Sequence, residues 1–351
     1  MKKISNKIHE KSSTESQKFS RIKKKIRFVV KKQGKQIKRY LNPRKKDFSK
    51  RSTKVQSVTT YFPSKRNIET KKDFIQYYQQ EDKNIIRTYG NEIFKYGRFL
   101  ESIHQIPHTF LKNHQIEHNL RAKIVNYFFE LIKVSKTEYQ VFFLTVYIMD
   151  SFLSKTSKKH HDSEFFLVAF TSLLVSSKLE CTKPFTIIDI LQLCCKISKS
   201  SYTENDIREK ETEIMLTLNF DFVNYSAYDF AETFIFDFTS NNSNEIDKFK
   251  MKDYVDTLDH ICLHLLKVLL LDVEFNKYNQ SLIAIACMII SYEILISNYP
   301  DITQEISSFL YTWINSLMSE TRYPREKVME IYHEIKKLWE KNQNDTENNC
   351  D

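Results

Sequence analysis

The chain has 351 residues, 41% hydrophobic and 13% aromatic, which is enough for one large or two medium globular domains. Its net charge of +10 is unevenly divided: residues 1–66 hold 23 basic and 3 acidic side chains, and the remainder holds 31 basic and 41 acidic ones. All three glycines precede residue 98, so the later body lacks the glycines that a phosphate-binding loop or a dinucleotide fingerprint needs.

Residues 1–84 are rich in Lys, Arg, Ser and Gln, and we predict a disordered basic tail. Its polar, charged start is not the pattern of a signal peptide. Two basic runs are typical of nuclear import or of nucleic-acid contact: Lys23, Lys24 and Lys25, then Arg44, Lys45 and Lys46. We therefore expect a nuclear protein, with the cytoplasm as a second location, whose tail makes at most weak contact with nucleic acid.

From about residue 85 the apolar residues recur at the three- and four-residue spacing of amphipathic helices. The predicted helices cover 85–103, 119–133, 137–155, 162–180, 185–197, 204–219, 226–238, 250–272, 277–297, 302–318 and 323–341. One leading helix and two sets of five predict an all-α protein with tandem five-helix domains.

The expected domains are residues 85–222, which include the leading helix, and residues 223–341, followed by a disordered end at 342–351. The apolar run 281–296 is short and contains Glu293, so we interpret it as a core helix and expect no membrane association. The six cysteines form no CxxC pair and lie mostly in apolar stretches, which favours buried, reduced thiols.

The predicted helix 119–133 carries Arg121 on its apolar stripe, three and four residues before Ile124 and Val125. A buried arginine needs a partner, because an unpaired buried charge costs several kcal/mol. Asp150 lies on the apolar stripe of the next helix. The pattern predicts a bidentate Arg121–Asp150 pair between the two helices. The alternative is that both side chains reach the edge of the domain.

Several segments resemble the cyclin family. "LRAKIVNYFFEL" (120–131) resembles the opening of the cyclin box, and "YIMDSFLSK" (147–155) resembles its second helix, with one extra hydrophobic residue before the aspartate. "LVAFTSLLVSSKLE" (167–180) and "REKETEIMLTLNFDF" (208–222) resemble the third and fifth helices. The five signature positions of the family fall on Arg121, Asp150, Leu167, Lys178 and Glu211, and all five hold the family's residue type.

The resemblance extends to "YGNEIFKYGRFLE" (89–101), similar to the helix before the box in A- and B-type cyclins, and to "KYNQSLIAIACMIISYEIL" (277–295), similar to the third helix of their second box. It implies two tandem cyclin folds and a regulatory subunit that binds and activates a cyclin-dependent Ser/Thr protein kinase in cell-cycle control. Lys178 would donate to backbone carbonyls of the kinase and Glu211 would accept its backbone N–H groups. Without the resemblance, both would be interpreted as ordinary solvated charges.

In A- and B-type cyclins the first helix of the box also docks substrate proteins. The matching positions are Leu120, Lys123, Ile124, Tyr127 and Glu130. Lys123 replaces an apolar residue and Tyr127 replaces the usual tryptophan. A cation at this position disfavours basic docking motifs, so we expect docking of the usual kind to be weakened.

The main rival is a transcription factor that binds nucleic acid, because the core of general initiation factor B also has two cyclin folds. That family usually brings a cysteine-rich zinc ribbon and a basic core, whereas residues 1–180 contain no cysteine and the body is acidic. An enzyme is disfavoured because we find no glycine loop and no catalytic motif. The "HHD" at 160–162 lacks a third ligand, so no metal or other cofactor is expected.

Overall fold

The computed structural model describes residues 90, 92–117, 119–241, 248–299 and 304–347, all within one unit that starts at Gly90. These residues are mainly helical, and their one β-bridge is the isolated pair Gln115–His161. The all-α prediction is confirmed. The basic tail, including both lysine- and arginine-rich runs, lies outside the described residues.

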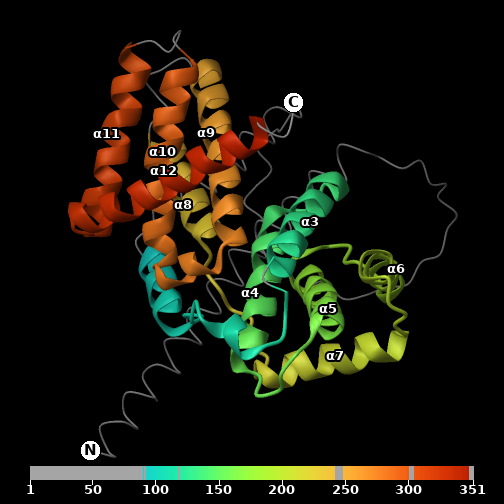
Figure 1. The fold of residues 1–351 in the computed structure, drawn as a ribbon. Coiled ribbons are helices and arrows are strands. Elements are labelled where there is room, and N and C mark those ends of the chain that lie inside the picture. Colours follow the sequence, from blue (N-terminus) through green and yellow to red (C-terminus); the bar gives the residue numbers. More distant parts are fainter. Residues whose placement is uncertain (1–89, 91, 118, 242–247, 300–303, 348–351) are drawn as a thin grey trace, which may run out of the picture. The chain divides into compact units, whose positions relative to one another are not determined.

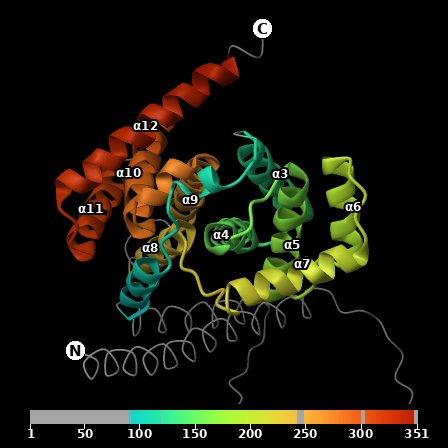
Figure 2. The same cartoon turned by 60° about the horizontal axis from the view of Figure 1, so that its bottom comes forward.

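The first set of five helices packs around α5. The set comprises α3 (Leu120–Ser135), α4 (Tyr139–Lys155), α5 (Asp162–Glu180), α6 (Ile187–Ser198) and α7 (Glu204–Thr217). Helix α5 contacts α4, α6 and α7, and α4 also contacts α3 (Figure 2). Small buried side chains on α5, such as Ser172 and Ser176, allow these neighbours to approach closely.

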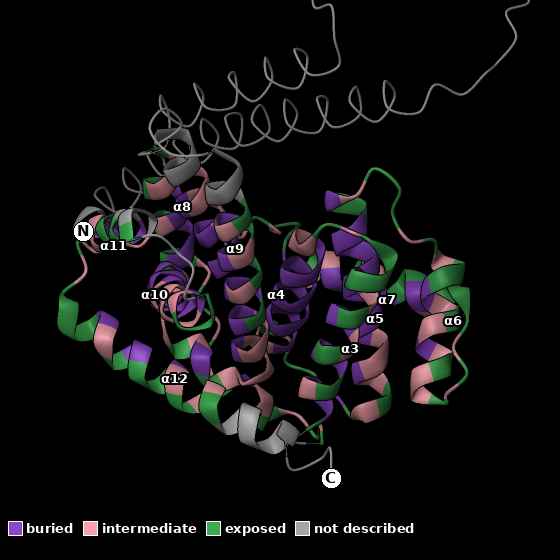
Figure 3. Cartoon of the chain, turned by 90° about the horizontal axis from the view of Figure 1, so that it is seen from above, coloured by how far each residue is buried: buried purple, intermediate pink, exposed green. Residues whose placement is uncertain are grey.

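The second set packs around α10. It comprises α8 (Ala227–Asn241), α9 (Lys248–Leu271), α10 (Gln280–Asn298), α11 (Gln304–Thr321) and α12 (Arg325–Glu347), as Figure 1 shows. Helix α10 contacts all four of the others. Among the described helices it is also the one long and apolar enough to cross a membrane, and 61% of that apolar stretch is buried. Its buried colouring in Figure 3 agrees with the interpretation of residues 281–296 as a core helix.

The predicted helices match the observed ones closely because prolines and polar caps mark their ends. Thr203 caps α7 by accepting from the backbone N–H of Asp206, 3.3 Å away, as the sequence "TEND" suggests. Helix α12 differs: it continues to Glu347, into the segment 342–351 expected to be disordered. No glycine or proline follows Pro324 to end that helix.

The leading helix, described over residues 92–103, precedes the first set in sequence but packs against the second. Its Phe94 ring lies 5.8 Å from Phe230 and 6.0 Å from Phe234, both on α8. Gly97 lies against Tyr225 and Phe230. The two helical sets are therefore linked in two ways. The segment after α7 connects them along the chain, and the leading helix, which precedes the first set in the chain, packs on the second set.

Candidate functional site

Arg121 and Asp150 form the predicted pair. Nε of Arg121 donates to Oδ1 of Asp150 at 3.0 Å, and Nη2 donates to Oδ2 at 2.6 Å. Each residue is only 2% exposed. The bidentate geometry is confirmed, and the alternative in which both charges reach the edge of the domain is wrong for this structure.

Arg121 makes a further contact that the sequence did not predict. Its Nη1 donates to the carbonyl oxygen of Leu270 at 2.8 Å and of Leu271 at 3.3 Å, where α9 ends. The last carbonyls of a helix have no partner within the helix and carry partial negative charge, so a guanidinium stabilises them. The sequence does indicate that Arg121 needs a further acceptor, because a carboxylate takes only some of the five donors of arginine and the others need acceptors when buried.

Lys178 and Glu211 lie together at the surface of the first set. Lys178 is in the last turn of α5 and Glu211 is in α7, and these helices pack side by side. The Nζ of Lys178 lies 2.5 Å from Oε1 and 2.8 Å from Oε2 of Glu211. The lysine side chain is 40% exposed and the glutamate 13% exposed. In the isolated chain the two signature charges are therefore each other's partner.

Exposed apolar side chains lie on the elements that carry this pair. Leu179 follows Lys178, Leu216 is in α7, and Phe220 and Val223 follow α7, all at least 36% exposed. The leading helix presents two more, Phe99 and Ile103. The imidazole of its neighbour His104 lies 3.7 Å from the carboxylate of Asp221, which brings the end of that helix beside the segment of Phe220.

Phe220 has an unusual backbone. Its φ is 56°, and that of the preceding Asn219 is 50°, so both residues are in the left-handed region. This region is rare for a bulky side chain and costs of order 1–3 kcal/mol. Hydrogen bonds from both N–H groups to carbonyls in the last part of α7 hold the turn. As a result the phenyl ring points away from the core and is 63% exposed.

The expected substrate-docking positions on α3 offer little apolar surface. Leu120 and Ile124 are 8% and 2% exposed, because they share the apolar stripe that α3 buries. The half-buried Tyr127 ring packs near Phe170, and burial raises the pKa of its hydroxyl. Lys123 and Glu130 are exposed; their ion-pair partners are Glu117 at 3.0 Å and Lys267 at 3.8 Å. The surface at these positions is therefore mainly charged.

The remaining predicted residues fall within the packed body. Leu167, in α5, is half-buried. His160 of the "HHD" stretch is fully buried, and the described part of the chain holds no group of three His, Cys, Asp or Glu suited to a metal ion. Cys194, Cys262 and Cys287 are buried free thiols, and burial raises the pKa of Cys194 to about 12. These cysteines have the character expected of core residues.

Comparisons with known proteins give one family match for each of the two helical sets. Residues 92–223 match the family "Cyclin, N-terminal domain" and residues 227–351 match "Cyclin, C-terminal domain". The chain is 24% identical to a G2/mitotic-specific cyclin-B of Spisula solidissima over 220 residues, 63% of this chain and 47% of that protein. It is 25% identical to a putative cyclin-A3-1 of Arabidopsis thaliana over 250 residues, 70% of this chain and 64% of that protein.

A solved structure has the same fold. The X-ray structure of a viral cyclin from herpesvirus saimiri superposes with a TM-score of 0.50 at 16% identity, over 70% of this chain and 97% of that one. At such low identity the match shows the fold alone. The chain spans about half the length of the cyclin-B relatives that it matches, 47% and 55% for the proteins of Spisula solidissima and Patella vulgata.

Proposed function

The chain belongs to the cyclin family, and on that premise we propose that it is a non-catalytic regulatory subunit that binds and activates a cyclin-dependent Ser/Thr protein kinase in cell-cycle control. The observation that supports this most directly is the Lys178–Glu211 pair together with the exposed apolar side chains of the same two helices and the segment after α7: Leu179, Leu216 and Phe220. Charged groups beside exposed apolar side chains are typical of a protein interface.

In this proposal the two charges exchange partners when the kinase binds. An ion pair at a partly exposed position contributes only about 0–1 kcal/mol, so separating Lys178 from Glu211 costs little. Lys178 then donates to backbone carbonyls of the kinase, and Glu211 accepts its backbone N–H groups. Charge-assisted bonds to backbone are strong and do not depend on the partner's side chains.

The apolar side chains supply the anchors of the same interface. Phe220 is held in a strained backbone conformation with its ring exposed, and strain of this kind is common where a side chain must be presented. Large aromatic residues dominate interface energetics when they enter a pocket on the partner. The cyclin performs no chemistry: it shifts the regulatory helix and activation loop of the kinase into their active positions.

The experiment is affinity purification of the tagged full chain with mass spectrometry of the kinases that it retains. We expect a cyclin-dependent kinase to be recovered, and its kinase activity to be lost with Lys178→Ala, Glu211→Ala. The matched control is Glu204→Ala, Arg208→Ala, which removes a more exposed ion pair from α7. Recovery of no kinase, or equal binding and activation by the Lys178/Glu211 variant, would show the proposal to be wrong.

We further propose a nuclear location, on the strength of the basic runs 23–25 and 44–46. Alanine substitution of both runs in a fluorescent fusion is expected to move the protein to the cytoplasm. The rival function, a nucleic-acid-binding transcription factor, is less well supported because residues 67–351 hold 31 basic and 41 acidic side chains. A surface of that charge repels a phosphate backbone.

A further inference from the structure

The leading helix has two faces with different partners. Arg98 and Glu101 both contact Ser281 of α10, whereas Phe99 and Ile103 are 39% and 54% exposed. The spacing of four places Phe99 and Ile103 on one side of the helix, about half a turn away from Glu101. One side of this helix is therefore fixed to the body while the other faces solvent.

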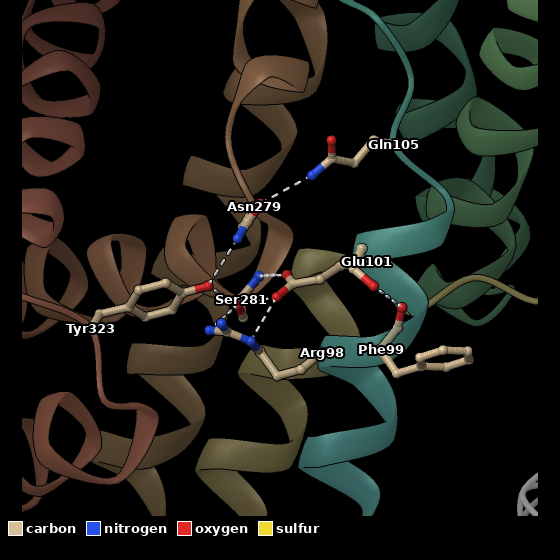
Figure 4. Close-up of polar contacts among 8 residues, drawn as sticks. Arg98, Phe99, Glu101, Gln105, Asn279, Ser281 and Tyr323 are labelled. Carbon is tan, nitrogen blue, oxygen red and sulfur yellow. Dashed lines mark hydrogen bonds and ion pairs between the residues drawn. The ribbon is translucent and has the colours of Figure 1, made fainter. Parts of the chain in front are cut away.

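Glu101 binds the N-terminus of α10 (Figure 4). One carboxylate oxygen accepts from the backbone N–H of Ser281 at 2.9 Å, and the other accepts from its hydroxyl at 2.8 Å. The residue at the N-cap of α10, Asn279, makes no side-chain capping bond. The first N–H groups of a helix lack partners within it and attract negative charge. A side chain 180 residues earlier in the sequence thus serves as the cap of α10.

Arg98 and Tyr323 complete this contact. Nε of Arg98 lies 3.0 Å from Oε1 of Glu101, and the guanidinium carbon lies 4.3 Å from the centre of the Tyr323 ring. The Tyr323 hydroxyl lies 2.8 Å from Oγ of Ser281, and Figure 4 shows these side chains converging. Glu101 and Ser281 are 5% and 0% exposed. The buried centre of the cluster, Glu101 and Ser281, is flanked by the partly exposed Arg98 and Tyr323. A hydrogen-bonded network with a buried centre fixes geometry better than a surface contact does.

We propose that Glu101 is a positioning residue for kinase binding: its capture by α10 holds the leading helix so that Phe99 and Ile103 extend the surface around Lys178 and Phe220. This rests on the proposed function. The second helical set would then contribute to kinase affinity without touching the kinase, because it fixes the orientation of a helix that does. An unanchored helix must be ordered during binding, and that ordering lowers affinity.

The test uses the full chain and the kinase recovered by affinity purification. Glu101→Gln keeps the shape but removes the charge that Arg98 and α10 attract, and we expect kinase affinity about tenfold lower. Ser281→Ala weakens the same contact from its other side and should act in the same direction. The matched control is Glu92→Gln, which makes the same charge change at an exposed position of the same helix and should leave affinity unchanged.

Two readouts separate positioning from general loss of stability. Amide hydrogen exchange over residues 92–103 should become faster in Glu101→Gln, while exchange in α4 and α5 stays as in the wild type. Removing both apolar groups, Phe99→Ala with Ile103→Ala, should reduce affinity in the wild type but much less in the Glu101→Gln background.

Each result has a distinct meaning. If the wild type binds no kinase, the proposed function is wrong and this inference falls with it. If the wild type binds but Glu101→Gln and Ser281→Ala bind equally well, only the positioning role is wrong. Full additivity of the Glu101 and Phe99/Ile103 changes would also overturn it, because it would mean that the apolar contacts form without the anchor.

Discussion

The Nη1 atom of Arg121, in α3, lies 2.8 Å from the carbonyl oxygen of Leu270, in the last turn of α9. The next α-helix along the chain, α10, receives the carboxylate of Glu101 at its N-terminus. The C-terminal carbonyls of α9 thus receive a cation, and the N-terminal N–H groups of α10 receive an anion. Helix dipoles favour both arrangements. Glu101, Asp150 and Leu270 also line one cavity of about 60 Å³, so both contacts border the same cavity.

The first prediction concerns Arg121. Arg121→Met leaves the Asp150 carboxylate buried and unpaired, and also removes the donor to Leu270. We expect the free energy of unfolding to fall by about 3–5 kcal/mol, measured by urea denaturation. Lys123→Met, at an exposed position of the same helix, should change it by no more than about 0.5 kcal/mol.

A second variant isolates the contact with α9. Arg121→Met with Asp150→Leu removes both buried charges, so it should regain part of the lost stability. It should not regain all of it, because the carbonyls of Leu270 and Leu271 still lack their donor. Complete recovery would mean that the contact with α9 contributes nothing.

The sequence predicted the elements and the charge pair for physical reasons that act locally. Apolar spacing and the positions of prolines determine where helices begin and end, and a charge on a buried stripe requires a partner on a neighbouring stripe. The Arg121–Asp150 pair followed from that requirement alone. The contact with Leu270 did not: the spare donors of Arg121 indicate that a further acceptor is needed, but the residue type of Leu270 does not indicate that its backbone carbonyl is that acceptor.

Other features depended on tertiary structure. Glu101 has the pattern of an ordinary solvated helix residue, and nothing in its neighbourhood in the sequence indicates α10. The left-handed turn at Phe220 was not foreseen, because the sequence there shows no glycine to mark it. Leu120 and Ile124 were assigned to a surface by family resemblance, although their own spacing places them on the buried stripe of α3.

The second prediction concerns a carboxyl group where α4 meets α8. The pKa of Glu232 is raised to about 8, mainly by burial and to a lesser extent by the nearby carboxylates of Asp229 and Asp259. Gln140, whose Nε2 donates at 2.7 Å, and Tyr228 oppose this shift. The ordinary value is 4.5, so the folded state holds the proton more tightly than the unfolded state. Its contribution to stability is complete below about pH 4.5 and is lost as the pH rises through about 8.

Glu232→Gln cannot titrate, so its stability relative to the wild type should increase with pH. We expect the free energy of unfolding of Glu232→Gln, relative to that of the wild type, to be about 1–3 kcal/mol higher at pH 8.5 than at pH 5. Urea denaturation at both pH values measures this difference. Glu138→Gln, an exposed carboxylate at the start of α4, should show no such change. A difference between Glu232→Gln and wild type that is independent of pH would mean that Glu232 ionises normally.

The third prediction concerns His160, whose ring is fully buried against Phe152. Burial lowers its pKa from 6.5, and Lys210 and His114 lower it further, against an opposing effect of Glu164. The unfolded state therefore binds the proton more readily, so the contribution to stability is present above pH 6.5 and is lost as the pH falls below it. The thermal midpoint of unfolding of His160→Leu should be lower than that of the wild type at pH 7.5, and the difference between the two midpoints should be smaller at pH 5.5. A difference in midpoint that is the same at both pH values would contradict this prediction.

The last prediction concerns Gly97, in the leading helix. Alanine normally stabilises a helix by about 1 kcal/mol relative to glycine. Here a Cβ atom would lie 2.7 Å from Cδ1 of Tyr225 and 3.0 Å from Cε1 of Phe230. The two rings pack edge to face, and the Tyr225 hydroxyl lies 2.5 Å from Oγ1 of Thr233, so neither ring moves freely.

Gly97→Ala should therefore lower the free energy of unfolding by about 1–3 kcal/mol, in spite of the better helix propensity. Ser102→Ala, at an exposed position of the same helix, should stay within about 0.5 kcal/mol of the wild type. Because the same packing seats the helix that carries Glu101, Gly97→Ala should also speed amide exchange over residues 92–103. A higher midpoint for Gly97→Ala would mean that the rings of α8 and its preceding segment yield, and that close approach is not why glycine stands there.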